Sequence, residues 1–300
     1  MLRTLDFYVT QCQVLVMIEE PIQIEHLPEL NDPLFIAGFD GWGNALDISR
    51  GMVDYMIRKL DATLFGKFNP DLFYRFDENR PLVEIENGLL KRITPPGGLL
   101  YATKRGSVGR DMVILKATEP SLRWFHFVDA TLTLCQKMGV KMIISLGSMY
   151  DDVLHTDFIV SAISSSEEIL SKLKGKNVGT INYKGPGAIH STINSEAKER
   201  GFDTMSLWCH CPFYLQGTTH SGLLSRLGSL LSWWGGFELD TEELDTSWRE
   251  LNKQIQGIID KNPELQGMIS GLRKAKIKGS WDTAKRHDKI IHLEDFLNPK

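Results

Sequence analysis

An unbroken apolar run, Leu34–Ala37, opens the clearest structural unit of the chain. Short continuous apolar runs are typical of strands that are buried on both faces of a sheet. A turn of small residues, 38–44, follows, and then comes a helix-like spacing of apolar positions at Ile48, Met52, Met56 and Leu60. The turn glycines allow a sharp change of direction, and Asn44 is a natural helix cap. The pattern predicts a strand–loop–helix unit.

The same pattern recurs along the chain. Further strands are predicted at 61–68, 99–103, 112–115, 142–146, 158–163 and 204–209, and helices at 124–135, 166–173, 189–200 and 223–231. Asn87-Gly88 lies between apolar runs at 82–85 and 89–93 and signals a β-hairpin. Buried strands that alternate with amphipathic helices indicate an α/β fold, a mostly parallel sheet between two helical layers. We expect the hairpin to make that sheet mixed.

The hydrophobic pattern changes after residue 240. Thr241 is a natural N-cap, Asn262-Pro263 breaks the helix, and a second helix starts near Leu265. Apolar residues follow the first helix at spacings of three and four, namely Leu244, Trp248, Leu251 and Ile255. This stripe either packs on the chain's own sheet or forms a contact between subunits. The intramolecular alternative is the commoner one in proteins.

These boundaries divide the chain into four parts. We predict an N-terminal leader with a strand or hairpin over 1–32, an α/β/α core over 33–238, a helical hairpin over 239–274 and a charged tail over 275–300.

Composition narrows the class of protein. The chain has 300 residues and a net charge of −4, which gives no electrostatic reason to expect nucleic acid or an anionic membrane as partner. Its four cysteines are too few and too irregularly spaced for a disulfide framework, which fits a reduced, cytoplasmic setting. No signal peptide and no apolar run of about 18 residues is found, so we expect no membrane segment.

Polar side chains cluster where the predicted strands end. Ligands of open α/β sheets bind beyond the carboxyl ends of the strands. The candidates for such a crevice are Asp40, Trp42, Asn44, Glu119, Arg123, Ser148, Tyr150, Asp151, Asp152, His155, Asp157, Tyr183 and His210. They could hold a ligand or transfer protons. The alternative, which we favour, is that they are ordinary loop polar groups.

No motif specifies a catalyst. The loop Gly41-Trp42-Gly43 lacks the lysine and serine of a phosphate loop, and Asp40 would repel an anion. Cys209-His210-Cys211 has no second cysteine pair, and a strand would point the two sulfurs away from the histidine, so buried thiols are favoured over a metal site. Ser148 is not part of a G-x-S-x-G elbow. We expect no catalytic residue, metal or cofactor.

Several segments together resemble the prokaryotic branch of the proteasome assembly chaperone 2 family. They are LFIAGFDGWGNALD, FNPDLFYRFDENRP, RITPPGG, ILKATEPSLRW, LGSMYDDVLHTD, YKGPGAIHSTINSEAKERGFDTMSLWCHCPFYL and the helical DKNPEL region, and they run from Pro33 to Leu272. The resemblance implies an α/β/α core related to purine nucleoside phosphorylases, and homo-oligomers. It carries no catalytic residues.

Relatives in that family assist assembly of the proteasome α-ring, some through a C-terminal hydrophobic–tyrosine–any tripeptide. This chain ends in Asn298-Pro299-Lys300, so we expect no docking of that kind.

Two functions follow as hypotheses. The first, which we favour, is a non-enzymatic, chaperone-like assembly factor that binds a protein client. The alternative is a small-molecule-binding protein, or a hydrolase- or phosphorylase-like enzyme, that uses the strand-end crevice. A purine phosphorylase needs a basic or hydroxyl residue for its anion in the first loop, and Asp40 argues against it.

Overall fold

The computed structural model describes residues 19–105 and 109–278. A nine-stranded sheet forms its centre, in the order β1-β3-β6-β7-β2-β8-β11-β9-β10. Its strands are β1 (Ile22–Ile24), β2 (Leu34–Asp40), β3 (Thr63–Phe68), β6 (Gly98–Thr103), β7 (Met112–Thr118), β8 (Met142–Asp151), β9 (Val160–Ser164), β10 (Val178–Thr180) and β11 (Asp203–Pro212).

The four central strands β7, β2, β8 and β11 are parallel to one another, with Ile36 between Ile114 and Ile144. They are the continuous apolar runs of the sequence, because a central parallel strand is covered on both faces. Strands β1, β3 and β6 extend the sheet antiparallel on one side, and β9 pairs antiparallel with β11 on the other. The predicted α/β class with a mixed sheet is confirmed.

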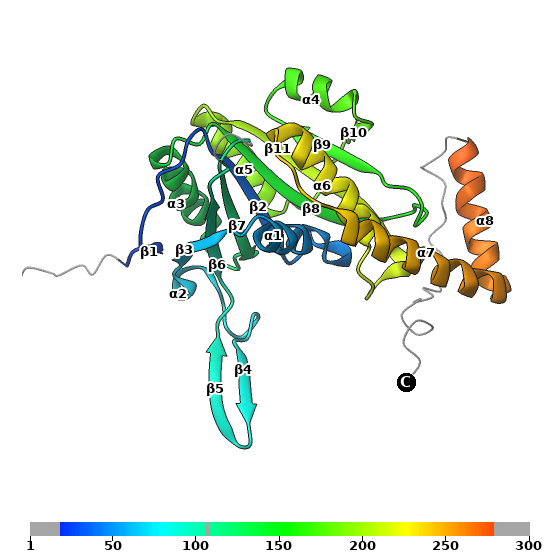
Figure 1. Cartoon of the computed structure of the whole chain (residues 1–300), viewed down its shortest axis with the longest axis horizontal. Helices are drawn as coiled ribbons and strands as arrows, with labels where there is room; N and C mark the ends of the chain where they lie inside the picture. Colours follow the sequence, from blue (N-terminus) through cyan, green and yellow to red (C-terminus); the bar gives the residue numbers. More distant parts are fainter. Residues whose placement is uncertain (1–18, 106–108, 279–300) are drawn as a thin grey trace, which may run out of the picture.

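Helices cover both faces of the sheet (Figure 1). Alternate residues of β2 divide between two buried clusters, Leu34 and Ile36 in one, Phe35 and Ala37 in the other. The first cluster includes side chains of α1 (Ile48–Lys59), α4 (Glu167–Lys174) and α6 (Ser221–Gly235). The second includes side chains of α2 (Pro70–Phe73), α3 (Trp124–Lys137) and α5 (Ile189–Glu199). These two cores make the three-layer arrangement.

The predicted helical hairpin is present as α7 (Glu242–Lys261) and α8 (Pro263–Lys278). Leu244 and Ile255 of α7 are buried in the first cluster, and Trp248 and Leu251 pack against it. The apolar stripe is therefore covered by its own chain, and these four residues do not present a free surface for a subunit contact. Part of the cover comes from α6, because α7 packs against it and side chains of both helices share the first cluster.

The hairpin around Asn87-Gly88 corrects one prediction. Strands β4 (Leu82–Glu86) and β5 (Leu89–Thr94) form a separate two-stranded sheet, which projects from the body in Figure 1. The main sheet is mixed because of its outer strands and not because of this hairpin. The turn itself is as expected, since Asn87 and Gly88 both have positive φ, 51° and 79°.

Some boundaries also differ. Strand β11 continues to Pro212, beyond the predicted end at 209, because its parallel pairing with β8 continues to Asp151. Helix α8 extends to Lys278, beyond the expected start of the tail at 275. Of the leader predicted over 1–32, β1 lies at the sheet edge beside β3. Residues 1–18 of the leader and the tail from 279 on lie outside the described residues.

Candidate functional site

The carboxyl ends of the central strands lie at one edge of the sheet, as parallel pairing requires. The loop after β2 is tied to β8 there. The backbone N–H of Ser148 donates to the carbonyl of Gly43 (2.8 Å), and the Ser148 hydroxyl donates to the carbonyl of Ala45 (2.8 Å). Ser148 is fully buried. It holds the loop in place and has no contact with solvent through which a substrate could reach it.

Asp40 and Asn44 belong to a second local network. Asn44 Nδ2 donates to Asp40 Oδ1 (3.2 Å), and its Oδ1 accepts from the backbone N–H of Arg50 in the first turn of α1 (3.1 Å). Asn44 was predicted to cap this helix, but the N-cap position of α1 is Asp47, and Asn44 precedes the 3-10 turn Ala45–Asp47. Its side chain still accepts one free N–H of the first turn of α1. Arg50 also pairs with Asp40 (3.1 Å). The carboxylate of Asp40 is therefore compensated by Arg50 of the helix that follows the loop.

Glu119 decides what this edge can bind. Its Oε1 accepts from the backbone N–H of Ile189, the first residue of α5 (2.8 Å), and its Oε2 accepts from the N–H of Trp42 (3.3 Å). A helix N-terminus beside a glycine loop is a typical anion site. Here the chain's own carboxylate occupies it. A phosphate would meet that negative charge, so the geometry disfavours a phosphorylase-type site.

The glycines of the loop serve packing. Gly41 has φ of +136°, and a Cβ built on it would lie 2.9 Å from Cβ of Glu119. A Cβ on Gly43 would lie 3.1 Å from Cε1 of His190. Both positions therefore lack room for a larger residue, which is the plain interpretation of the motif. Trp42, between them, is 63 % exposed.

Three side chains form a hydrogen-bonded chain that only the structure reveals. His210 Nδ1 lies 2.7 Å from Asp151 Oδ2, and its Nε2 lies 2.9 Å from the hydroxyl of Ser161. The hydrogen bond from His210 lowers the pKa of Asp151. An acid, an imidazole and a hydroxyl in this order also form the relay of serine hydrolases. However, Ser161 is 2 % exposed and lies within β9, so a substrate carbonyl cannot reach its oxygen.

His155 does not belong to this Asp151–His210–Ser161 network and lies in a buried aromatic cluster. Its backbone N–H donates to the hydroxyl of Tyr214 (2.7 Å), which also lies 2.8 Å from His155 Nδ1. His220 donates from Nε2 to the carbonyl of His155 (2.9 Å) and stacks on Trp248 of α7, with ring centroids 4.5 Å apart. Burial lowers the pKa of His155 and of His220 to about 4, so both are neutral at pH 7. The cluster joins the core to the helical hairpin.

The other predicted residues are spread along the rim. Tyr183 is 63 % and Tyr150 44 % exposed, and the Tyr183 hydroxyl donates to the carbonyl of Pro186 (2.9 Å). Arg123 is an exposed residue with positive φ that begins α3. Asp152 follows β8 and donates its N–H to Asp151, and Asp157 accepts from the N–H of Leu154. Sequence patterns missed Phe125, an aromatic residue that is 69 % exposed.

The cysteine pair behaves as the strand pattern predicts. Cys209 and Cys211 lie in the first core cluster, whereas His210 faces the opposite side of the sheet. Burial raises the pKa of Cys209 to about 12, so its thiol is protonated and unreactive. Among the described residues, no group of three histidine, cysteine or carboxylate side chains could hold a metal ion.

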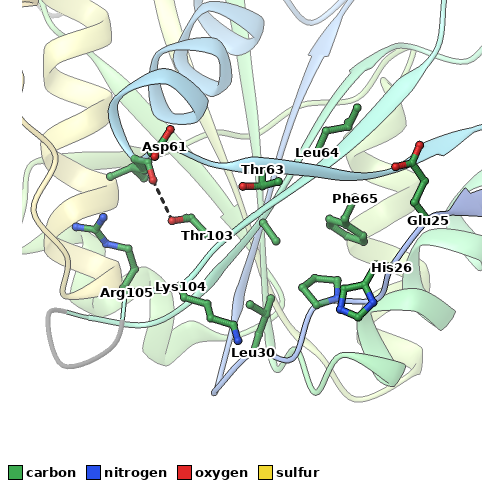
Figure 2. A pocket seen from close by; sticks show the side chains of 13 residues that line it. Glu25, His26, Leu30, Asp61, Thr63, Leu64, Phe65, Thr103, Lys104 and Arg105 are labelled. Atoms are coloured by element: carbon green, nitrogen blue, oxygen red, sulfur yellow. Dashed lines mark hydrogen bonds between the residues drawn. The ribbon is translucent and has the colours of Figure 1, made fainter.

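A pocket of about 530 Å³ lies at the opposite edge of the sheet (Figure 2). Its lining includes Leu60, Thr63 and Phe65, which follow α1, and Thr103 and Arg105 at the end of β6. Thr103 donates to the carbonyl of Leu60 (3.0 Å). None of the predicted crevice residues lines this pocket. The pocket and the strand-end edge are therefore two separate surface regions with no lining residue in common.

Comparisons with known proteins agree with this architecture. The model of the PAC2 family matches residues 35–259. A PAC2 family protein from Streptomyces avermitilis is 26 % identical, with a TM-score of 0.68 over 79 % of this chain and 100 % of that one. A protein of unknown function from Corynebacterium glutamicum is 21 % identical, with a TM-score of 0.78 over 87 % and 98 %. No match was found among curated proteins.

An archaeal structure is similar as well. PbaB of Pyrococcus furiosus, described as an archaeal proteasome activator, is 19 % identical, with a TM-score of 0.60 over 79 % of this chain and 97 % of that one. Because the family model covers well over half of the sequence, the chain belongs to the PAC2 family. Among the described residues, the helices include none that is long and apolar enough to span a membrane.

Proposed function

We propose that this protein is a chaperone-like assembly factor that binds a protein partner. The binding surface is the aromatic rim, defined as the exposed side chains around the strand-end edge, Trp42, Phe125, Tyr150 and Tyr183. One contrast carries the proposal. The polar groups of the edge are bonded to one another, as Glu119 is to the N-terminus of α5, while aromatic side chains around it are exposed. Exposed aromatic residues are enriched at protein interfaces, where they supply contact area at low entropic cost.

The relatives support the same class of function. PbaB is described as a proteasome activator, and a Mycobacterium tuberculosis structure, 22 % identical with a TM-score of 0.68, as a proteasome-assembly chaperone homologue. We propose that this chain likewise acts on a protein assembly, in the cytoplasm and as a homo-oligomer. Its buried free thiols at Cys135, Cys209 and Cys211 are compatible with a reduced compartment.

Site-specific photo-crosslinking in the native cell tests the proposal. A photoreactive phenylalanine analogue replaces Trp42 or Phe125 in the full chain, and the control carries it at Lys253, an exposed position on α7. We expect one discrete second protein to be captured from positions 42 and 125 and not from 253. Capture that is equal at all three positions, or absent at 42 and 125, would contradict a protein-binding rim.

A second candidate, a hydrolase-like activity, is favoured by one observation only, the Asp151–His210–Ser161 chain. It requires β9 to move so that the Ser161 hydroxyl meets a substrate. A fluorophosphonate probe, which labels activated serines, tests it on the folded protein. Labelling that disappears in Ser161→Ala would support this candidate, and no labelling of the native chain would leave the relay a structural feature.

A further inference from the structure

Arg123 has a backbone conformation that is unusual for its residue type. Seven non-glycine residues in the described part of the chain have positive φ, and five of these are aspartate or asparagine. After glycine, those two types adopt the left-handed region most readily. The two exceptions are Leu46 and Arg123, with φ of 52° and 54°. Both lie at the strand-end edge, in the loops that follow the parallel strands β2 and β7.

Only one of these two conformations is compensated within the chain. Leu46 is 5 % exposed and its side chain belongs to the first buried cluster, so packing offsets the strain. The side chain of Arg123 is exposed and forms no hydrogen bond or ion pair with a described residue. Strained backbone is concentrated at functional sites, where it holds a side chain in position. The contact that favours arginine at position 123 is therefore not found within the described part of the chain.

The backbone around Arg123 is held rigidly. It belongs to a short corner, residues 121–125, that leads into α3. The N–H groups of Ser121 and Leu122 both donate to the carbonyl of Phe73, at 2.9 and 3.0 Å. Because these bonds join the corner to a distant segment, its shape is fixed before any partner arrives. A contact made here has little ordering cost in the backbone.

The neighbours of Arg123 complete a surface that is typical of interface centres. Leu122 is 41 % and Phe125 is 69 % exposed. Arginine and aromatic side chains are enriched among the residues that contribute most to protein binding. The corner therefore presents one cation between two apolar groups.

The acidic side chains of the two segments beside the corner are already engaged. Asp77 and Glu78 each pair with Arg75, both at 2.7 Å, and Glu119 accepts two main-chain N–H groups. These carboxylates are therefore bound elsewhere, and Arg123 is available to a carboxylate from outside the chain.

We propose that Arg123 binds a carboxylate side chain of the partner protein, while Leu122 and Phe125 contact an apolar side chain beside it. The planar guanidinium matches a carboxylate through two parallel N–H···O bonds. The net charge of −4 does not attract acidic proteins in general, so the contact depends on local geometry. This inference rests on the proposed function, because Phe125 belongs to the aromatic rim, and it names the chemistry that the rim recognises.

Charge reversal in the full-length protein tests the contact. A photoreactive phenylalanine analogue at position 42 captures the partner in the cell, from the otherwise native chain, from Arg123→Glu and from Lys253→Glu. The last variant is the control, since Lys253 is an exposed residue of α7 and its charge changes by the same amount. We expect Arg123→Glu to lower the captured yield at least tenfold and Lys253→Glu to leave it within twofold.

The analogue at position 125 locates the contact on the partner. The cross-linked peptide should contain an aspartate or glutamate within a few residues of the link. Changing that acid to lysine should restore capture by Arg123→Glu to within threefold of the native yield. A linked peptide that comes from this chain itself, or that is phosphorylated at the link, would overturn the proposal.

Arg123→Asn keeps the test decisive if Arg123→Glu does not fold. Asparagine tolerates the left-handed backbone and is a good N-cap, so the melting temperature should rise while capture falls at least fivefold. A lower melting temperature would show that Arg123 serves its own fold, against the proposal. Native capture that both variants leave unchanged would overturn the carboxylate contact and leave the protein-binding rim standing. No capture by the native chain from position 42 or 125 would overturn both.

Discussion

The stripe of α7 and the apolar face of the β4–β5 arm, the hairpin over residues 82–94, are alike in sequence and opposite in structure. Both are amphipathic, and both pair an apolar side with a charged one, which in the arm holds Glu84 and Arg92. Ile255 of α7 is 0 % exposed within its own chain, whereas Ile85 of the arm is 62 % exposed. The difference shows that an apolar pattern predicts that a surface is covered, but not by what. In α7 the cover is the core, whereas among the described residues nothing covers the arm.

The largest expected effect is a loss of folding stability in acid, which arises in part from histidines beside the covered stripe of α7. Burial lowers the pKa of His155 and His220 from 6.5 to about 4, and the rings of both lie beside Trp248 of α7. Burial has the same effect on the pKa of His190, which lies away from the stripe, beside Phe39 and Trp208. Between these values the unfolded chain binds more protons than the folded chain, so stability falls as pH drops from 6.5 towards 4. At pH 5 the loss is on the order of 2 kcal/mol for each histidine.

Urea unfolding at pH 7.5 and pH 5 measures this loss. The arm has no histidine between residues 82 and 94, so its own strand pairing should not share this dependence. His220→Gln should reduce the difference between the two pH values by about one histidine's share. A free energy of unfolding that is the same at both pH values would show that these histidines are not buried and neutral.

Truncation inside the covered stripe is expected to have the next largest effect. Ile255→Ala removes a fully buried side chain and should lower the free energy of unfolding by about 2–5 kcal/mol. The matched change Ile85→Ala, in dilute protein, should cost less than about 1 kcal/mol because that side chain is largely in water. Chemical denaturation of both variants makes the comparison. Equal losses would mean that the two surfaces are covered alike.

A hydrogen bond between α6 and α7 gives a smaller effect. The Ser225 hydroxyl donates to Asp245 Oδ1 (2.6 Å) and helps to hold α7 on the core. Ser225→Ala should cost about 1–2 kcal/mol, since it removes a bond to a charged acceptor. Ser247→Ala, on the exposed side of α7, is the control and should change stability by about 0.5 kcal/mol or less. Thermal melts of the two variants should differ in the same order.

The smallest effect is expected on the charged face of the arm. Arg92 and Glu84 are both more than half exposed, and exposed ion pairs contribute about 0–1 kcal/mol. Arg92→Gln should therefore leave the melting temperature almost unchanged. A loss of stability well above about 1 kcal/mol in this variant, measured by thermal melts, would mean that the pair is shielded from water.

Local patterns determined much of this protein. Continuous apolar runs predicted the central strands, Asn87-Gly88 predicted the arm's turn, and alternation along β11 placed Cys209 and His210 on opposite faces. Thr241 was found as the N-cap of α7, although Asp240 provides the side-chain bond to the N–H of Glu242 (3.0 Å). These features depend on residues that are close in sequence, so the sequence alone contains their cause.

Tertiary structure decided the rest. Ser161 meets His210 across 49 residues, and Glu119 meets the N-terminus of α5 across 70, because strand order and register bring those segments together. The same register separated His155 from the strand-end groups with which sequence proximity had placed it. Whether an apolar stripe is covered or exposed also depends on which distant element packs there. Such contacts are set by the topology of the whole chain, and spacing within one segment does not contain them.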